Sequence, residues 1–283
     1  MLTCILMGGL GNQLFQIFAT IAYGLKSQKE VVFPDVKSLG TGNTIVRPTY
    51  WHTIFSELSE MLKPPTVVPN DCIIREHSFN YREIPNSDLQ NVYLFGYFQS
   101  YKYFQAYSSI IQKLLKFKSK QMNVLKSSGF SKEELKNTIS MHFRMGDYKK
   151  NPSYHPIMPY EYYEKSLSFV EKSLPEKKLH VLYFCENEDY DAVLEKIEKL
   201  QCQFRNYTFS RATPVLEDWQ QLLLMSLCKY NIIANSSFSW WGAYLNRDED
   251  KIVCYPHLWF GVACNNNTDD LFPENWIKIL FVT

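Results

Sequence analysis

Short apolar runs and longer amphipathic segments alternate along most of the chain. In the first third, the order is an apolar run at 2–7, a glycine turn at 8–11, a segment with a 3.6-residue apolar period at 12–27 and an apolar run at 31–33. This order predicts a strand, a turn, a helix and a second strand, which together form a βαβ opening. A further helix is predicted over 100–125. Prolines and polar residues interrupt 40–91, and no element is predicted there.

The alternation becomes clearer after residue 137. Strands are predicted over 138–144, 179–185, 202–209, 232–234 and 252–255, and helices over 160–174, 190–200, 217–229 and 240–245. Strands that alternate with helices of this length are typical of a parallel, doubly wound sheet. We therefore predict an α/β chain with two Rossmann-like domains that face each other across a cleft. The boundary is placed near the polar break that starts at residue 127, which gives domains of residues 1–130 and 131–283.

Composition narrows the function classes. The formal net charge is +1, with 46% hydrophobic and 21% charged residues, which indicates a globular protein and argues against a general polyanion binder. No apolar run is long enough for a transmembrane helix, and the N-terminus lacks the basic region of a signal peptide. The seven cysteines form no C-x-x-C pair, as expected of reduced thiols. We expect a cytoplasmic protein with no transmembrane segment and no nucleic-acid partner.

The first segment with chemical character is the glycine loop at 8–13. Because it joins a strand to a helix, Gly9 and Gly11 would let backbone N–H groups approach a phosphate at the positive end of the helix dipole. A tight turn without a ligand is the simpler interpretation. A dinucleotide fingerprint is a third, since Asp35 follows the second strand where a ribose-binding acid would lie. Against it, Leu14 occupies the third glycine position.

The second segment lies at the end of the strand 138–144. Ligands bind at strand carboxyl ends in open α/β sheets, and Arg144 offers a fork of donors to phosphate oxygens. Gly146 permits a sharp turn, and Asp147 could orient Arg144 or accept a proton. An ordinary Arg–Asp ion pair that closes a turn is the alternative. The spacing of His142 and His155 is too loose to suggest a metal site.

The third segment, 235–243, follows a short strand and opens a helix. Ser236 and Ser237 would ordinarily cap that helix, but hydroxyls, free N–H groups and the Trp240–Trp241 pair together could also form a phosphate site. At least one of the two tryptophans is expected to serve packing alone.

In any enzyme that uses a nucleotide sugar, the departing diphosphate develops negative charge that must be stabilised. This is done either by a divalent metal held by a D-x-D motif or by Arg and backbone N–H groups. D-x-D strings occur at 189–191 and 248–250, but such short acidic triplets arise easily by chance. With Arg144 and two helix N-termini available, we expect no metal and no cofactor.

Taken together, these segments resemble the signatures of the α-1,2-fucosyltransferases, glycosyltransferase family eleven. Residues 8–16 resemble its N-terminal signature, 142–148 its H-x-R-R-x-D motif, 235–243 its third signature with 224–228 leading into it, and 186–189 a weaker acidic feature. The matches are in order and span nearly the whole chain, so together they are far more specific than any one motif.

The resemblance implies a GT-B-type fold and an inverting, metal-independent transfer of fucose from GDP-fucose. The acceptor would be a galactose-terminated oligosaccharide fucosylated at its 2-hydroxyl, in carbohydrate metabolism or in protein or lipid glycosylation. The domain 131–283 would bind the donor and 1–130 would form the acceptor side.

The resemblance also implies roles for individual residues. Arg144 would bind the β-phosphate, and His142 would lie by the guanosine. The other donor-binding residues are expected to be Gly9, Gly11, Asn12, Asp218 (or its neighbour Glu217), Ser236, Ser237 and Phe238.

In place of the second arginine of the family motif stands Met145, for which Lys149 or Lys150 could compensate. The base that deprotonates the acceptor is predicted to be Asp147, or alternatively His155. Two other classes stay open: a nicotinamide-dependent oxidoreductase that uses the glycine loop and Asp35, and a non-catalytic carbohydrate-binding protein that uses the many aromatic residues.

Overall fold

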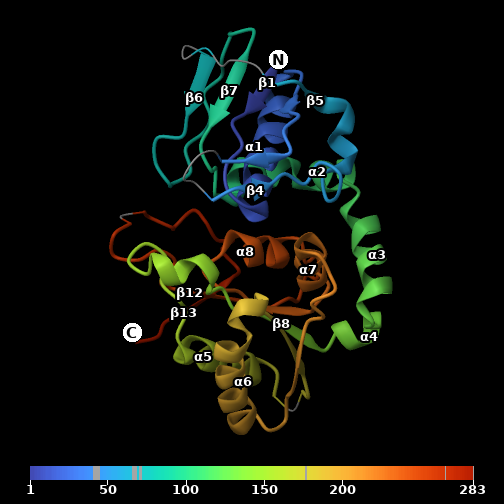
Figure 1. Cartoon of the computed structure of the whole chain (residues 1–283), viewed down its shortest axis with the longest axis vertical. Helices are drawn as coiled ribbons and strands as arrows, with labels where there is room; N and C mark the ends of the chain where they lie inside the picture. Colours follow the sequence, from blue (N-terminus) through green and yellow to red (C-terminus); the bar gives the residue numbers. More distant parts are fainter. Residues whose placement is uncertain (41–44, 66–68, 70–71, 176, 265, 283) are drawn as a thin grey trace. The chain divides into compact units, whose positions relative to one another are not determined.

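The computed structural model describes residues 1–40, 45–65, 69, 72–175, 177–264 and 266–282 (Figure 1). The chain forms two compact units. Unit 1 comprises Met1–Lys120 and Asn266–Pro273, and unit 2 comprises Gln121–Asn265 and Glu274–Thr283. The division therefore falls earlier than the expected 130/131 boundary, inside helix α3 (Phe117–Ser128), and a short C-terminal segment belongs with unit 1. Among the described residues, no helix combines the length and apolar composition needed to cross a membrane.

Unit 1 is built around one long helix and a small parallel sheet. Helix α1 (Leu10–Ser27) packs on a sheet of order β1-β7-β6, made of β1 (Leu2–Cys4), β6 (Ile73–Arg75) and β7 (Val92–Phe95). Two strand pairs complete it: β2 (Phe33–Pro34) runs parallel to β5 (Leu62–Lys63), and β3 (Ser38–Leu39) antiparallel to β4 (Arg47–Pro48). The predicted βαβ opening is present, although the expected strand at 31–33 is reduced to a single bridge between Leu2 and Val31 and the start of β2.

The helix predicted over 100–125 is wrong as a single element. The chain forms 3₁₀ turns at Tyr101–Tyr103 and Gln105–Tyr107, then α2 (Ser108–Leu114) and α3. Lys116 has a positive φ of 50° between the two helices. A residue in this left-handed conformation cannot continue a right-handed helix, so the element ends there.

Unit 2 is a six-stranded, entirely parallel sheet of order β10-β9-β8-β11-β12-β13. Its strands are β8 (Thr138–His142), β9 (His180–Phe184), β10 (Thr208–Arg211), β11 (Tyr230–Ile232), β12 (Val253–Pro256) and β13 (Ile277–Ile279). Its helices are α4 (Lys132–Leu135), α5 (Tyr160–Ser173), α6 (Tyr190–Gln203), α7 (Asp218–Met225) and α8 (Ser237–Tyr244). Counted from β8, this is the 3-2-1-4-5-6 order of a doubly wound Rossmann sheet, as predicted.

Sequence patterns placed the elements of unit 2 correctly but erred at several boundaries. The strand predicted from 202 starts only at Thr208, because Cys202 and Gln203 complete the last turn of α6. The strand predicted at 232–234 is β11, two residues earlier, and β13 was not predicted.

The two faces of β8 contact different parts of unit 2. Ile139 and Met141 alternate into the apolar core that α5 and α6 cover, on one side of the sheet in Figure 1. Ser140 and His142 point to the other face, where α7 and α8 lie. There the buried Asn231 on β11 donates to Ser140 Oγ at 2.7 Å. A polar contact therefore joins the two central strands just below the edge at which both end.

Candidate active site

The functional edge of unit 2 lies where β8 and β11 end side by side. These strands pair through Ile139–Tyr230 to Met141–Ile232, and the sheet order reverses between them. The carboxyl edge at such a switch point is where open α/β sheets bind ligands. The chain leaves β8 into the loop of Arg144 and leaves β11 into the loop of Ser236, so the structure brings together two of the three segments singled out by sequence.

Arg144 is held by three groups at this edge. Its guanidinium forms ion pairs with Asp147 and Glu186, and it lies over the ring of Tyr148 at 5.2 Å from the centroid. The Arg144 side chain is only 18% exposed. The Arg144–Asp147 ion pair, which the sequence left open as the alternative to an anion site, is present. Glu186 is a second carboxylate that sequence reasoning did not connect to Arg144.

The buried carboxylate of Asp189 anchors the loop that contains Arg144. This carboxylate is 1% exposed and accepts from the backbone N–H of Gly146 at 2.7 Å and from Lys149 Nζ at 2.6 Å. Gly146 has a positive φ of 30°, and a Cβ at this position would collide with Glu186 Oε2. The positive φ therefore favours glycine here, and a Cβ would displace the end of the Glu186 side chain.

Tyr148 connects the two loops. Its hydroxyl donates to the backbone carbonyl of Asn235 at 3.0 Å, and its ring stacks on His155 at 4.7 Å. Asn235 Nδ2 in turn donates to the carbonyls of Pro156 and Trp259. Both candidate bases, Asp147 and His155, therefore lie on the loop that holds Arg144, and burial lowers the pKa of His155 while the Asp147 charge partly opposes this.

His142 is buried and has an unused polar atom. It is 8% exposed, and Nδ1 has no hydrogen-bond partner within the described residues. Burial, with a smaller contribution from Arg144, lowers the pKa of the imidazole to about 3, so it is neutral near pH 7. Its ring lies 5.5 Å from that of Phe238. The predicted donor-binding residues His142 and Phe238 are therefore neighbours.

The N-terminus of α8 begins at Ser237, earlier than predicted. Ser236 is its N-cap, and its hydroxyl accepts from the N–H of Phe238 at 3.3 Å. Trp240 and Trp241 are fully buried, which confirms packing as a role of this pair. Asp218 lies elsewhere on the same edge, exposed in the first turn of α7, where it accepts from the N–H of Trp219 at 2.7 Å.

The glycine loop of unit 1 is shaped by buried amides. Gly8 has a φ of +77°, Gly9 is the N-cap of α1, and no side chain caps that helix. Gln13 Nε2 donates to the carbonyl of Gly8 at 3.1 Å, and Gln16 exchanges two hydrogen bonds with the backbone of Met7. The amides next to the glycines, which a dinucleotide fingerprint does not need, thus hold the loop in shape.

Asn12 and Gly11, the other predicted ligands in this loop, start α1. Asn12 Oδ1 accepts from Gln99 Nε2 at 2.8 Å, which ties the helix start to the segment after β7. Leu14, at the position of the missing third glycine, is fully buried.

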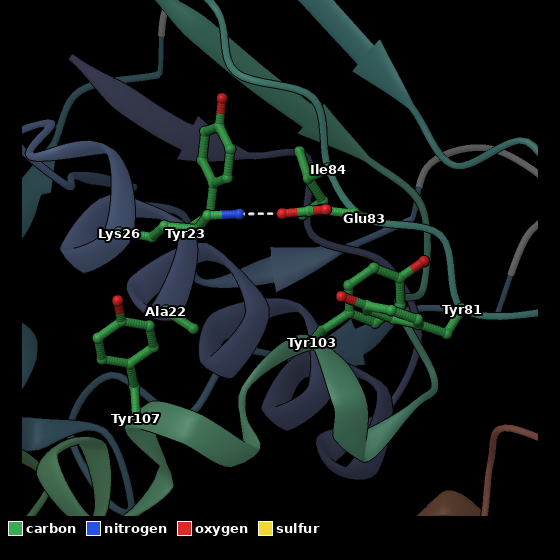
Figure 2. A pocket seen from close by; sticks show the side chains of 8 residues that line it. All are labelled: Ala22, Tyr23, Lys26, Tyr81, Glu83, Ile84, Tyr103 and Tyr107. Atoms are coloured by element: carbon green, nitrogen blue, oxygen red, sulfur yellow. Dashed lines mark hydrogen bonds and ion pairs between the residues drawn. The ribbon is translucent and has the colours of Figure 1, made fainter.

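A pocket in unit 1 lies at the far end of α1 (Figure 2). Tyrosines 23, 81, 103 and 107 line it, and the exposed ion pair between Lys26 and Glu83 borders it. Tyr23 is 13 residues after Leu10, about 20 Å along the helix from the glycine loop. None of the residues singled out by sequence lines this pocket.

Met145 and the acidic triplets have structural explanations. Met145 is 9% exposed and packs in the apolar core with Phe143, so it replaces the family's second arginine with a core side chain. Lys149, suggested as a substitute cation, is engaged by Asp189. Asp248 and Asp250 pair with Lys229. Among the described residues, no group of three or more His, Cys, Asp or Glu side chains is positioned to hold a metal.

Comparison with known proteins identifies the family. The model of glycosyl transferase family 11 matches residues 69–280. An Escherichia coli O-antigen biosynthesis glycosyltransferase, WbnK, is 30% identical over 97% of this chain and 99% of its own. An E. coli alpha-1,2-colitosyltransferase is 28% identical over 97% of each chain, and a Caenorhabditis elegans galactoside 2-alpha-L-fucosyltransferase is 24% identical over 99% of this chain and 79% of its own.

One solved structure shows the fold. The Arabidopsis thaliana FUT1 mutant R284K, solved in complex with GDP, superposes with a TM-score of 0.51 at 12% identity, over 90% of this chain and 70% of its own. The expected GT-B-type fold is confirmed, and the family match makes the chain a glycosyltransferase. The chain belongs to glycosyltransferase family 11, the α-1,2-fucosyltransferase family that its signatures resemble. Family membership decides against an oxidoreductase and against a non-catalytic carbohydrate-binding protein.

Proposed function

We propose that this chain transfers L-fucose from GDP-fucose to the 2-hydroxyl of a terminal galactose on a glycan, with inversion and without a metal ion. The observation that carries the proposal is the site at the switch point of unit 2. There Arg144 follows β8 by two residues and the N-terminus of α8 follows β11. His142 has a buried nitrogen without a hydrogen-bond partner among the described residues.

A nucleoside diphosphate suits this site chemically. Arg144 can offer parallel N–H donors to phosphate oxygens, and the first N–H groups of α8 add the positive end of a helix dipole. His142 is neutral near pH 7 and can make a hydrogen bond to the nucleoside without adding charge. The Arabidopsis protein of the same fold was solved with GDP, and the C. elegans relative is named a fucosyltransferase.

In the proposed reaction, the acceptor oxygen attacks C1 of fucose from the side opposite the phosphate. The bond from C1 to the β-phosphate oxygen breaks, GDP leaves, and the acceptor proton passes to a base. Arg144 and the α8 N–H groups stabilise the charge that develops on the leaving diphosphate. No D-x-D metal motif is needed for this, and the Asp189 carboxylate is already used by Gly146 and Lys149.

For the base we keep Asp147 as the first choice and His155 as the second. His155 stacks on Tyr148, and its lowered pKa favours the neutral form that can accept a proton near pH 7. Gly9, Gly11 and Asn12 of unit 1 are proposed to contact the diphosphate and fucose, and Asp218 the guanine.

A second candidate is transfer of colitose, which is fucose without its 3-hydroxyl. It is favoured by one observation, the name of the colitosyltransferase relative, which matches 97% of both chains. A site that hydrogen-bonds the 3-hydroxyl would reject the deoxy sugar strongly, whereas a site that leaves it in water would not. The two donors can therefore be distinguished by kcat/KM.

The experiment is product analysis by NMR. The protein is incubated with GDP-fucose or GDP-colitose and a small panel of galactose-terminated oligosaccharides, with and without EDTA. We expect GDP release and an α-1,2-linked fucosyl product at the same rate in EDTA. Abolition by EDTA would refute the metal-free mechanism, a different linkage would refute the acceptor assignment, and faster transfer from GDP-colitose would favour the second candidate.

A further inference from the structure

Glu186 binds Nη1 of Arg144, in the more exposed of the two ion pairs of this guanidinium. β8 and β9 are paired so that His142 lies beside Phe184. Arg144 and Glu186 each follow this pair by two residues, and their side chains form an ion pair. The missing Cβ of Gly146 leaves room for the Glu186 carboxylate to reach the guanidinium. The contact is therefore built by strand register and by a glycine, in addition to charge.

In the unliganded structure, two carboxylates pair with the single guanidinium of Arg144. One guanidinium with the Asp147 and Glu186 carboxylates has a net charge of −1. The nearby charge of Lys149 is matched by Asp189, and His142 is neutral near pH 7. Arg211, a further cation beside this loop, donates to the Asn187 side chain. A diphosphate that approaches this group meets excess negative charge, so its binding is favoured when one carboxylate releases Arg144 and phosphate oxygens take its place.

Glu186 is the carboxylate that can leave. Asp147 lies three residues from Arg144 in the same loop, and its side chain is 29% exposed. Glu186 comes from a different loop, and its side chain is 44% exposed, so it can turn into water with little rearrangement.

Resting on the proposed function, we propose that Glu186 is an affinity-setting residue that competes with the donor diphosphate for Arg144. In the unliganded protein its carboxylate takes the position of a phosphate oxygen, and donor binding exchanges one for the other. This competition lowers the affinity for the diphosphate. When GDP leaves, the Glu186 carboxylate binds Arg144 again.

The test is calorimetric titration with GDP, guanosine and inorganic pyrophosphate. Glu186→Gln removes the charge and keeps the shape, so GDP and pyrophosphate should bind about 3- to 10-fold more tightly, with guanosine changed less than about 2-fold. The gain should shrink as salt is raised. Glu186→Ala should show the same direction. Glu188→Gln, which removes an exposed carboxylate two residues away, is the matched control and should leave all three affinities unchanged.

The outcomes separate this inference from the function on which it rests. Weaker or unchanged binding of GDP and pyrophosphate by Glu186→Gln would overturn the inference. Glu186 would then either help Arg144 to bind the ligand or have no effect on binding. An equal gain in Glu188→Gln would also overturn it, as a general charge effect. If the wild type does not bind GDP, but Glu186→Gln binds pyrophosphate more tightly than the wild type does, the proposed donor is wrong. The competition between Glu186 and the diphosphate would still be supported. Binding of neither ligand would overturn both.

Discussion

Arg144 and Glu186 stand opposite each other because each follows, by two residues, a paired position on neighbouring parallel strands, and their side chains form an ion pair. The arginine that the proposed reaction needs is thus positioned by strand register. The surrounding contacts keep the loop in place: Gly146 and Lys149 bind Asp189, and Tyr148 binds the backbone of the neighbouring loop. The predictions below test these supports and then Arg144 itself.

Replacing Asp189 with Asn should loosen the Arg144 loop. The amide keeps the size of the side chain but loses the charge that Lys149 and the Gly146 N–H bind. Because Lys149 can turn to water, we expect a loss of about 1–3 kcal/mol in unfolding free energy, below the full cost of breaking a buried pair, together with a higher donor KM. Urea unfolding followed by tryptophan fluorescence measures the first, with the exposed Asp191→Asn as control. Unfolding of Asp189→Asn at the wild-type urea concentration, with an unchanged KM, would contradict the anchoring role.

Replacing Gly146 with Ala should destabilise the protein for two separable reasons. The positive φ costs about 1 kcal/mol for any residue with a Cβ. The new methyl group also displaces the Glu186 carboxylate from Arg144, at a smaller cost because that side chain can turn into water. Gly129→Ala isolates the first cost, because Gly129 also has a positive φ but open space around it. In a Glu186→Ala background the extra cost of Gly146→Ala should disappear. Additive costs in that double-mutant cycle would show that Glu186 does not crowd this position.

His142 should make the protein less stable as pH falls below about 6.5. Its imidazole has a pKa of about 3 when folded and an ordinary value near 6.5 when unfolded, so between these values the unfolded chain binds more protons. Stability is unaffected above this window and falls by at most about 1.4 kcal/mol per pH unit within it. Urea unfolding at pH 7 and pH 5 should show a larger loss for the wild type than for His142→Gln, with the exposed His52→Gln as control. A proton NMR titration in which His142 becomes charged near pH 6 would refute the argument.

Much of unit 2 could be predicted because its central strands are buried on both faces and alternate with amphipathic helices. The errors lie where tertiary contact decides, as at Cys202, which the pattern assigned to a strand and the structure assigns to the end of α6. In unit 1, the strands β6 and β7 were missed because they are only three and four residues long and follow a region without periodicity. Such short strands are defined by their pairing partners, which a local pattern does not reveal.

The sequence predicted which residues have suitable chemistry for the site, but not the hydrogen bonds and ion pairs that connect them. Arg144, Asp147 and Ser236 stand out because charged and hydroxyl groups directly follow strands. Asp189 was assigned to a chance D-x-D triplet, because its partners Gly146 and Lys149 lie about forty residues earlier. The position of Glu186 could have been inferred from the sequence, since Glu186 and Arg144 follow their strands by the same number of residues. That inference requires the register of β8 on β9, which the sequence pattern does not reveal.

The most direct test of the central claim is the rate of fucose transfer from GDP-fucose to lactose by the wild type and by Arg144→Ala. Loss of the guanidinium removes the main cation proposed to stabilise the leaving diphosphate, so kcat/KM should fall at least about 100-fold. Arg144→Lys should recover only part of it, because a lysine lacks the planar fork of donors. The exposed Arg205→Ala should match the wild type. Fucosyl transfer at a normal rate by Arg144→Ala, or no transfer by the wild type to any galactoside, would contradict the account.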